Sequence, residues 1–148
     1  MGLKLPPDFK EFLKLLNARG VEYLLIGGYA VGYYGYPRAT QDLNIWIAVN
    51  DENAERKETV LREFGFDTPG LSASLFLQDE NIIRMGVPPM RIEVLTRISG
   101  VEFDDCYAER VVDTVDEVEI SLIGLSQLKV NKKASGRYKD LDDLEHLP

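Results

Sequence analysis

The 148 residues of this chain carry a net charge of −8, and 45% of them are hydrophobic. Such a chain can bury a packed core, so we expect a single domain over residues 1–148 rather than a disordered chain. No apolar run reaches the roughly 18 residues that a membrane span needs. The N-terminal residues lack a signal-peptide pattern, so we expect a cytoplasmic protein. Cys106 is the only cysteine, which excludes an internal disulfide.

The first half of the chain alternates between helical and extended patterns. Apolar residues recur at helical spacing after Pro6-Pro7-Asp8, and Gly20 ends that helix. The clearest strand pattern is an alternation of polar and apolar residues around Asp42. The elements expected here are a helix over 7–19, a strand over 21–26, a short helix over 28–36, a strand over 41–49 and a helix from 50 to about 64.

The second half contains more strand patterns and ends in helices. Pro88-Pro89 stops one strand, and Gly136 breaks a helix that begins near Ser126. The segment 71–78 is ambiguous. The elements expected here are strands over 81–87, 91–96, 110–114 and 118–123, followed by helices over 126–136 and 139–147. Helices and strands alternate irregularly, which predicts an α/β (α+β) fold with a mixed sheet flanked by helices.

Gly27 and Gly28 lie between the first strand and the short helix. Two glycines let the backbone pass close to a ligand, and a helix that follows them offers unpaired N–H groups. This geometry is suited to holding phosphates. A tight turn made for packing explains the same pair of glycines.

Three polar residues fall where two strands could bring them together. Asp42 and Asn44 are two apart on one strand, so their side chains share a face. An Asp-x-Asp pair in this arrangement would hold a hard cation such as Mg²⁺ through oxygen ligands. Glu93 joins the cluster if its strand lies beside that of Asp42. The alternatives are a solvated strand face for Asp42 and Asn44, and a cross-strand pair of Glu93 with Arg91 or Arg97.

A basic segment interrupts the otherwise acidic chain. It carries five basic residues and no acids between positions 129 and 139: Lys129, Lys132, Lys133, Arg137 and Lys139. The acidic total disfavours a broad nucleic-acid surface. The segment itself is consistent either with a patch that meets phosphates or with a solvated helix face.

The order of these motifs resembles the nucleotidyltransferase superfamily, which has the DNA-polymerase-beta-like fold. Gly27-Gly28 is followed after 13 residues by Asp42-Leu43-Asn44, and Glu93 comes much later on another strand. The stretch 131–144, NKKASGRYKDLDDL, is similar to that of small bacterial members. Those members include minimal and abortive-infection-type nucleotidyltransferases, some of which belong to toxin–antitoxin pairs. The resemblance spans about residues 8–147.

The resemblance implies a reaction in which two Mg²⁺ ions bind a nucleoside triphosphate. An acceptor hydroxyl would attack the α-phosphorus and release pyrophosphate. The implied catalytic and metal-binding residues are Asp42, Asn44 and Glu93. The implied nucleotide-binding residues are Gly27, Gly28, Arg38, Thr40, Lys129, Lys132 and Lys133. The motif also allows Lys139 and Asp140 to be a structural pair.

Asn44 departs from the family pattern, because it stands where the second metal-binding carboxylate belongs. The chain is then either a natural variant with weakened catalysis or nucleotide binding alone, or an active enzyme that a substitution has silenced. The transferase hypothesis leaves the acceptor open among a protein side chain, an RNA end and a small molecule. A second hypothesis is a non-catalytic, antitoxin-like partner protein that binds through an exposed cluster of tyrosines: Tyr29, Tyr33, Tyr34 and Tyr36. Packing is the alternative explanation of that cluster.

Overall fold

The computed structural model describes residues 5–36, 42–48, 56, 82–87 and 90–148, with 82–87 and 90 described by their backbone alone. The helices are α1 (Pro7–Ala18), α2 (Gly27–Tyr33), α4 (Phe103–Ala108), α5 (Leu125–Ser135) and α6 (Tyr138–His146). The strands are β1 (Tyr23–Ile26), β2 (Asp42–Ile47), β3 (Ile82–Val87), β4 (Met90–Leu95), β5 (Val111–Val115) and β6 (Val118–Leu122).

Within the described ranges, six strands form one sheet in the order β3-β4-β2-β1-β6-β5. β2 runs parallel to β4 and antiparallel to β1, while β1 runs parallel to β6. The two edge strands, β3 and β5, pair antiparallel with their neighbours. The sheet is therefore mixed, and it brings β2 and β4 together although about 40 residues separate them in the chain.

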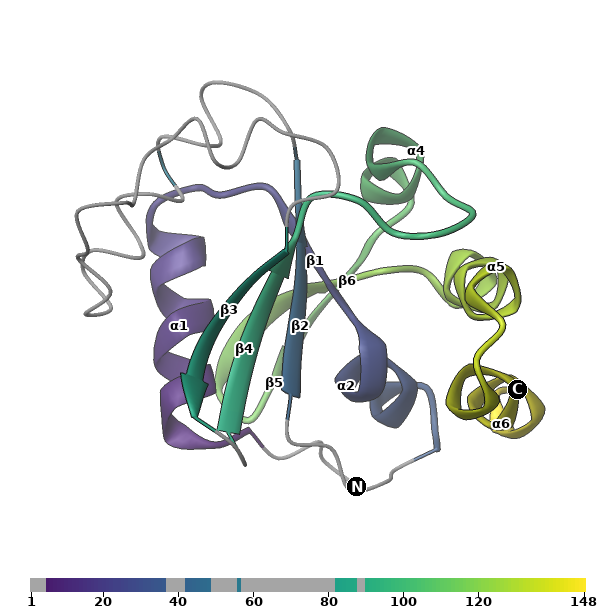
Figure 1. Cartoon of the computed structure of the whole chain (residues 1–148). Coiled ribbons are helices and arrows are strands. Elements are labelled where there is room, and N and C mark those ends of the chain that lie inside the picture. The colour runs from purple at the N-terminus through teal and green to yellow at the C-terminus, as the bar shows by residue number, and fades with distance from the viewer. Residues whose placement is uncertain (1–4, 37–41, 49–55, 57–81, 88–89) are drawn as a thin grey trace.

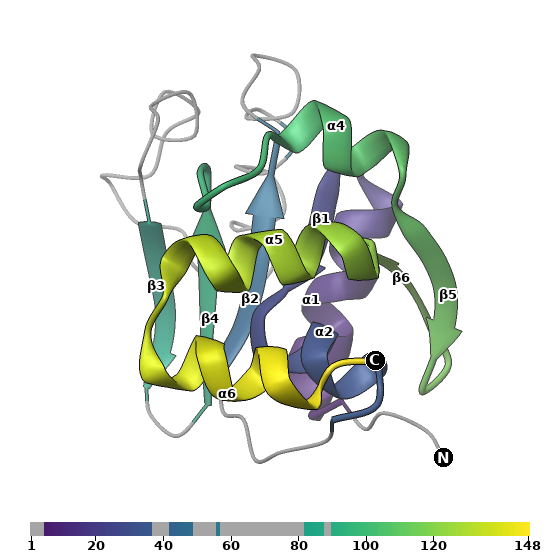
Figure 2. The ribbon, with the colours of Figure 1, turned by 90° about the vertical axis from the view of Figure 1, so that its right-hand side faces the viewer.

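Helices cover both faces of this sheet. Figure 1 shows α1 on one side and α4, α5 and α6 on the other, and Figure 2 shows α5 and α6 lying across β4 and β2. The apolar stripe of α1 is fully buried in the core: Phe9, Phe12, Leu13 and Leu16. On β2, Leu43, Ile45 and Ile47 are also fully buried. The alternation of β2 sends Asp42, Asn44 and Trp46 to the opposite face.

The α/β fold expected from the sequence is confirmed, and the strands lie within two residues of their expected positions. α5 ends at Gly136, whose φ of 65° places it in the left-handed conformation that glycine adopts easily. The sequence analysis missed α4, since its six residues are too few to show a helical period. The expected helix from 50 to about 64 lies outside the described residues apart from Arg56, which is helical, and so does the ambiguous segment 71–78.

The tyrosine cluster is not the exposed surface that the sequence suggested. Tyr29 is 6% exposed and packs edge-on against Phe9. Tyr33 and Tyr34 are partly buried against the core, and their hydroxyls donate to Asp113 and to the Ile123 carbonyl. The cluster therefore serves packing. No helix in the described part of the chain combines the length and the apolar character that crossing a membrane requires.

Candidate nucleotide site

The polar residues of β2 and β4 lie on one face of the sheet. The parallel pairing sets Asp42 opposite Arg91 and Asn44 opposite Glu93. Neighbouring residues at matched positions of paired strands point to the same face, as do residues two apart on one strand. The sequence therefore anticipated correctly that Glu93 lies beside the Asp42 strand.

These four side chains form two pairs. Asn44 Nδ2 donates a hydrogen bond to Glu93 Oε1 at 3.0 Å. Arg91 Nε and Nη2 donate to Asp42 Oδ1 and Oδ2, both at 3.3 Å. Arg91 was one of the two partners considered for Glu93, but it pairs with Asp42 instead. Side chains in this cluster are only partly buried, with 29% of Asp42 and 37% of Arg91 exposed.

The glycine turn packs directly onto this cluster. Ile26, at the end of β1, is paired with Asn44, so the chain turns into α2 immediately beside it. Gly27 has a φ of +70°, and a Cβ at this position would lie 2.7 Å from Asn44 Oδ1. Real Cβ atoms do not approach that closely, and L-residues rarely adopt that φ. Position 27 therefore requires glycine, both for its backbone and for the space that Asn44 occupies.

The junction of α5 and α6 brings a cation to the same cluster. Arg137 Nε donates to Asp140 Oδ2 at 2.8 Å, while 72% of the Arg137 side chain stays exposed. That hydrogen bond raises the pKa of Arg137, and the negative charges of Asp140 and Glu93 add to the shift against partial desolvation. Arg137 is therefore within electrostatic reach of Glu93. The sequence analysis saw it only as part of the basic segment.

Lys132 is held inside the α5–α6 junction. Its Nζ lies 3.2 Å from Asp140 Oδ1 and 3.0 Å from Asp143 Oδ2, and the three side chains are at most 5% exposed. Burial works to raise the pKa of Asp140, but hydrogen bonds from Arg137, Ser135 and Lys132 outweigh it and lower that pKa to about 2. Lys132 therefore lies neither on a solvated helix face nor on an open cationic patch. It joins the two helices.

The remaining basic and polar candidates fall in different places. Lys129 Nζ donates to the Pro148 carbonyl, and Lys133 is exposed on α5. Arg38 and Thr40 lie outside the described residues. The structure thus brings together Gly27, Asp42, Asn44 and Glu93, and it adds Arg91 and Arg137. Alternation on the strand could have signalled Arg91, because it shares a face with Glu93.

The residues of the cluster can be tested for divalent cations, which nucleotidyltransferases use. Asp42, Glu93 and Asn44 Oδ1 are oxygen donors of the kind that Mg²⁺ prefers. However, both Asp42 oxygens accept hydrogen bonds from Arg91, and Glu93 accepts one from the Asn44 amide. Over the described residues, no group of three or more His, Cys, Asp or Glu side chains is placed to hold a metal ion. The cluster as it is arranged does not fit a pair of divalent cations.

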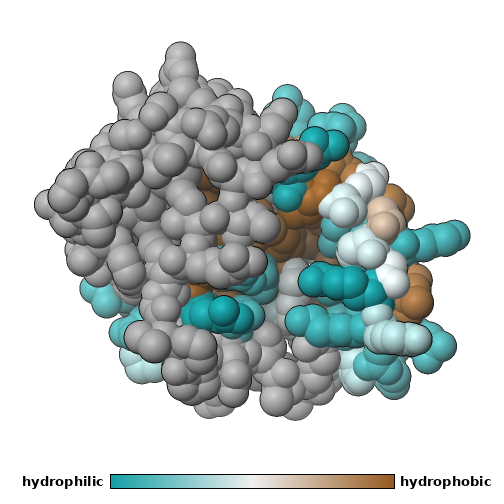
Figure 3. Space-filling view, viewed as in Figure 1, coloured by the Kyte–Doolittle hydropathy of each residue, from teal (hydrophilic) through white to brown (hydrophobic). Residues whose placement is uncertain are grey.

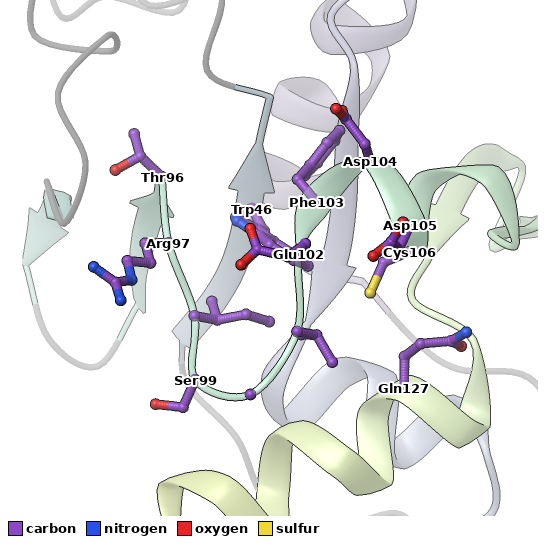
Figure 4. A pocket seen from close by; sticks show the side chains of 13 residues that line it. Trp46, Thr96, Arg97, Ser99, Glu102, Phe103, Asp104, Asp105, Cys106 and Gln127 are labelled. Carbon is purple, nitrogen blue, oxygen red and sulfur yellow. The ribbon is translucent and has the colours of Figure 1, made fainter.

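A cavity of about 1090 Å³ lies further along the same face. It is lined by Trp46 from β2, by the loop after β4, by α4 and by Gln127. Figure 4 shows Trp46 between the loop that carries Arg97 and Ser99 and the helix that carries Cys106. Figure 3 shows hydrophobic surface beside hydrophilic residues on the side where α4 and α5 lie. Trp46 is 2% exposed, and its Nε1 has no hydrogen-bond partner.

Comparison with solved structures identifies the class of fold. A Thermotoga maritima protein described as a candidate nucleotidyltransferase matches 91% of this chain and 86% of its own, with a TM-score of 0.62 at 15% identity. An antigenic nucleotidyltransferase-like protein from Paracoccidioides brasiliensis matches 95% of this chain and 76% of its own, with a TM-score of 0.53 at 18% identity. No family model and no curated protein sequence matches the chain. At these identities the likeness concerns the fold: this chain has the nucleotidyltransferase fold.

Proposed function

We propose that this chain is a nucleotidyltransferase-like protein that binds a nucleoside triphosphate where the Gly27–Gly28 turn meets β2 and β4. It transfers the nucleoside monophosphate to a protein side chain, an RNA end or a small molecule, and Asn44 weakens that transfer. The observation that carries the proposal is the contact between Gly27 and Asn44, which places the glycine turn on the polar cluster. It joins the family motifs in space, and not only in sequence.

The groups around the cluster are suited to a polyphosphate. The backbone at Gly27 and Gly28 lies beside the cluster, and small residues there let phosphate oxygens approach the chain. Arg137 adds an exposed guanidinium, which recognises phosphate through two hydrogen bonds at once. Lys133 is an exposed cation on α5, and Arg38 and Thr40 complete the proposed set on sequence grounds.

Asn44 is the reason to expect slow transfer. A neutral amide there cannot balance the charge that develops on the transferred phosphoryl group and its leaving group. Loss of one preorganised electrostatic group typically costs about 10²–10³-fold in kcat. A carboxylate at position 44 should recover part of that factor if Mg²⁺ is supplied.

The direct test measures label transfer from α-labelled nucleoside triphosphates with Mg²⁺, offering RNA, protein and small-molecule acceptors. We expect weak transfer by the wild-type chain and stronger transfer by Asn44→Asp. The matched control is Asn44→Asp combined with Asp42→Asn, which keeps one carboxylate on β2 but at the other position, and we expect it to be inactive. Absence of transfer by all three proteins with every acceptor would contradict the proposed reaction.

A second candidate function is a non-catalytic nucleotide-binding or antitoxin-like protein that keeps the fold. The paired arrangement of Asp42 with Arg91 and of Asn44 with Glu93 favours it, because both carboxylates already have partners. This candidate expects a stable protein partner in pull-downs and no gain of transfer in Asn44→Asp. A chain that stays solitary, or that gains activity with the carboxylate, would exclude it.

A further inference from the structure

The Asn44 amide bridges two elements that carry the site. Its Nδ2 donates to Glu93 on β4, and its Oδ1 lies against Gly27 at the end of β1. The orientation of the amide follows from chemistry, since the Glu93 carboxylate accepts hydrogen bonds and only the nitrogen of the amide can donate one. The side chain is therefore fixed between the glycine turn and the neighbouring strand.

A carboxylate at position 44 would meet a different situation. Asp and Asn have the same shape, so an oxygen would stand where Nδ2 now lies 3.0 Å from Glu93 Oε1. Two carboxylates at that separation cannot both stay ionised unless a cation or a proton lies between them. Asn44 removes this requirement, because its N–H group supplies the positive end of the contact.

The second carboxylate of the site is compensated in the same manner. Arg91 faces Asp42 through two contacts of 3.3 Å, and Arg137 acts electrostatically on Glu93. Each carboxylate therefore has a donor or a cation supplied by the protein itself. A divalent cation in this position would have to displace Arg91 from Asp42 and the amide from Glu93.

We propose that the site of this chain is independent of divalent metal, with Asn44 as the positioning residue that takes the place of a metal bridge between β2 and β4. The ligand is then held by backbone and arginine contacts alone. Only the identity of that ligand, a nucleoside triphosphate, rests on the proposed function. The metal independence follows from the two pairs themselves.

The test compares three proteins: the wild type, Asn44→Asp, and Asn44→Asp combined with Glu93→Gln. The double variant exchanges the amide and the carboxylate between the two strands. It keeps the number of charges of the wild type and can remake the hydrogen bond in the opposite direction. Thermal unfolding is followed in EDTA and in MnCl₂, and Mn²⁺ alone is titrated into each protein by calorimetry.

We expect the midpoint of the wild type to be the same in EDTA and in MnCl₂. Asn44→Asp should unfold at least about 3 °C lower in EDTA, because two carboxylates then share one site, and Mn²⁺ should restore its midpoint. The exchanged variant should regain the wild-type midpoint without metal. Asn44→Asp should bind Mn²⁺ at least about tenfold more tightly than either other protein.

Two results would overturn the proposal. One is tight Mn²⁺ binding by the wild type that equals that of Asn44→Asp. The other is an exchanged variant as destabilised in EDTA as Asn44→Asp, because the hydrogen bond would then not be what joins the strands. If Asn44→Asp fails to fold, a folded exchanged variant supports the proposal and an unfolded one contradicts it.

Titration of ATP in EDTA separates this proposal from the proposed function. Binding of ATP by the wild type in EDTA, unchanged by added Mn²⁺, supports both. Binding that appears only with Mn²⁺ contradicts the metal independence and leaves the nucleotide assignment intact. The expected stability and Mn²⁺ pattern without any ATP binding would support the metal independence and contradict the proposed ligand.

Discussion

Two regions of this molecule join acids to bases, and they differ in how far water reaches them. At the α5–α6 junction, Lys132, Asp140 and Asp143 have side chains that are 5%, 1% and 0% exposed. At the β2–β4 cluster, the Asp42 and Arg91 side chains are 29% and 37% exposed. Charges shut away from water depend on one another for their stability, whereas half-exposed charges can exchange a protein partner for a ligand.

The comparison assigns different roles to two sets of residues that look alike in the sequence. The buried junction holds α5 against α6 and so fixes the turn that presents Arg137. The half-exposed cluster lies beside the glycine turn, where a ligand can reach it. Each of the following variants tests whether this division holds, beginning with the largest expected effect.

Lys132→Met should give the largest loss of stability. It leaves Asp140 and Asp143 buried without their shared cation, and breaking a buried ion pair typically costs about 3–5 kcal/mol. The measurement is the free energy of unfolding from urea denaturation. Lys133→Met is the matched control, because Lys133 is exposed on the same helix and should change stability by less than about 0.5 kcal/mol. Equal effects of the two variants would remove the distinction between the regions.

Gly27→Ala should destabilise by about 2–3 kcal/mol and abolish nucleotide binding, since it combines an unfavourable φ with a clash against Asn44. Gly20→Ala is its control. Gly20 has nearly the same φ, +68°, but its nearest side-chain atom lies at an ordinary 3.5 Å. The control should show the cost of the backbone alone and keep nucleotide affinity. A Gly27→Ala variant that behaves like Gly20→Ala would show that the turn and Asn44 are not in contact.

The junction should also make stability depend on acid pH. The pKa of Asp140 is about 2 in the folded chain, below its ordinary value of 3.8. Its contribution is therefore complete above about pH 4 and is lost as pH falls toward 2, by about 2 kcal/mol in all. Urea denaturation between pH 5 and pH 2 should show this slope reduced in Asp140→Asn. Asp142→Asn, at a side chain that is 54% exposed, should keep the slope.

Arg91→Ala should have the smallest effect on stability, less than about 1 kcal/mol, because exposed ion pairs contribute little. Arg91→Lys keeps the charge but loses the paired contact, and it should lie between the wild type and Arg91→Ala. Urea denaturation at low and high salt measures both. A loss above about 2 kcal/mol for Arg91→Ala would mean that the β2–β4 cluster behaves like the buried junction.

The sequence predicted the site better than it predicted the junction. Alternation on β2 placed Asp42 and Asn44 on one face, and the order of motifs placed Glu93 beside them, so the cluster could be assembled from local periodicity and family resemblance. The Arg91 contact with Asp42 could not, because the register between parallel strands is set by packing. Lys132 looked like part of a surface run. Its burial depends on how α5 and α6 pack, which local pattern does not contain.

The central claim is that a nucleoside triphosphate binds where the glycine turn meets the β2–β4 cluster. Titration of ATP into ¹⁵N-labelled protein, followed by amide chemical shifts, tests it most directly. We expect the largest shifts at the Gly27 and Gly28 amides and at the Asn44 side-chain NH₂, with saturation at a single affinity. Shifts that leave these three groups unmoved, or that gather around Trp46 and the cavity it lines, would contradict the account.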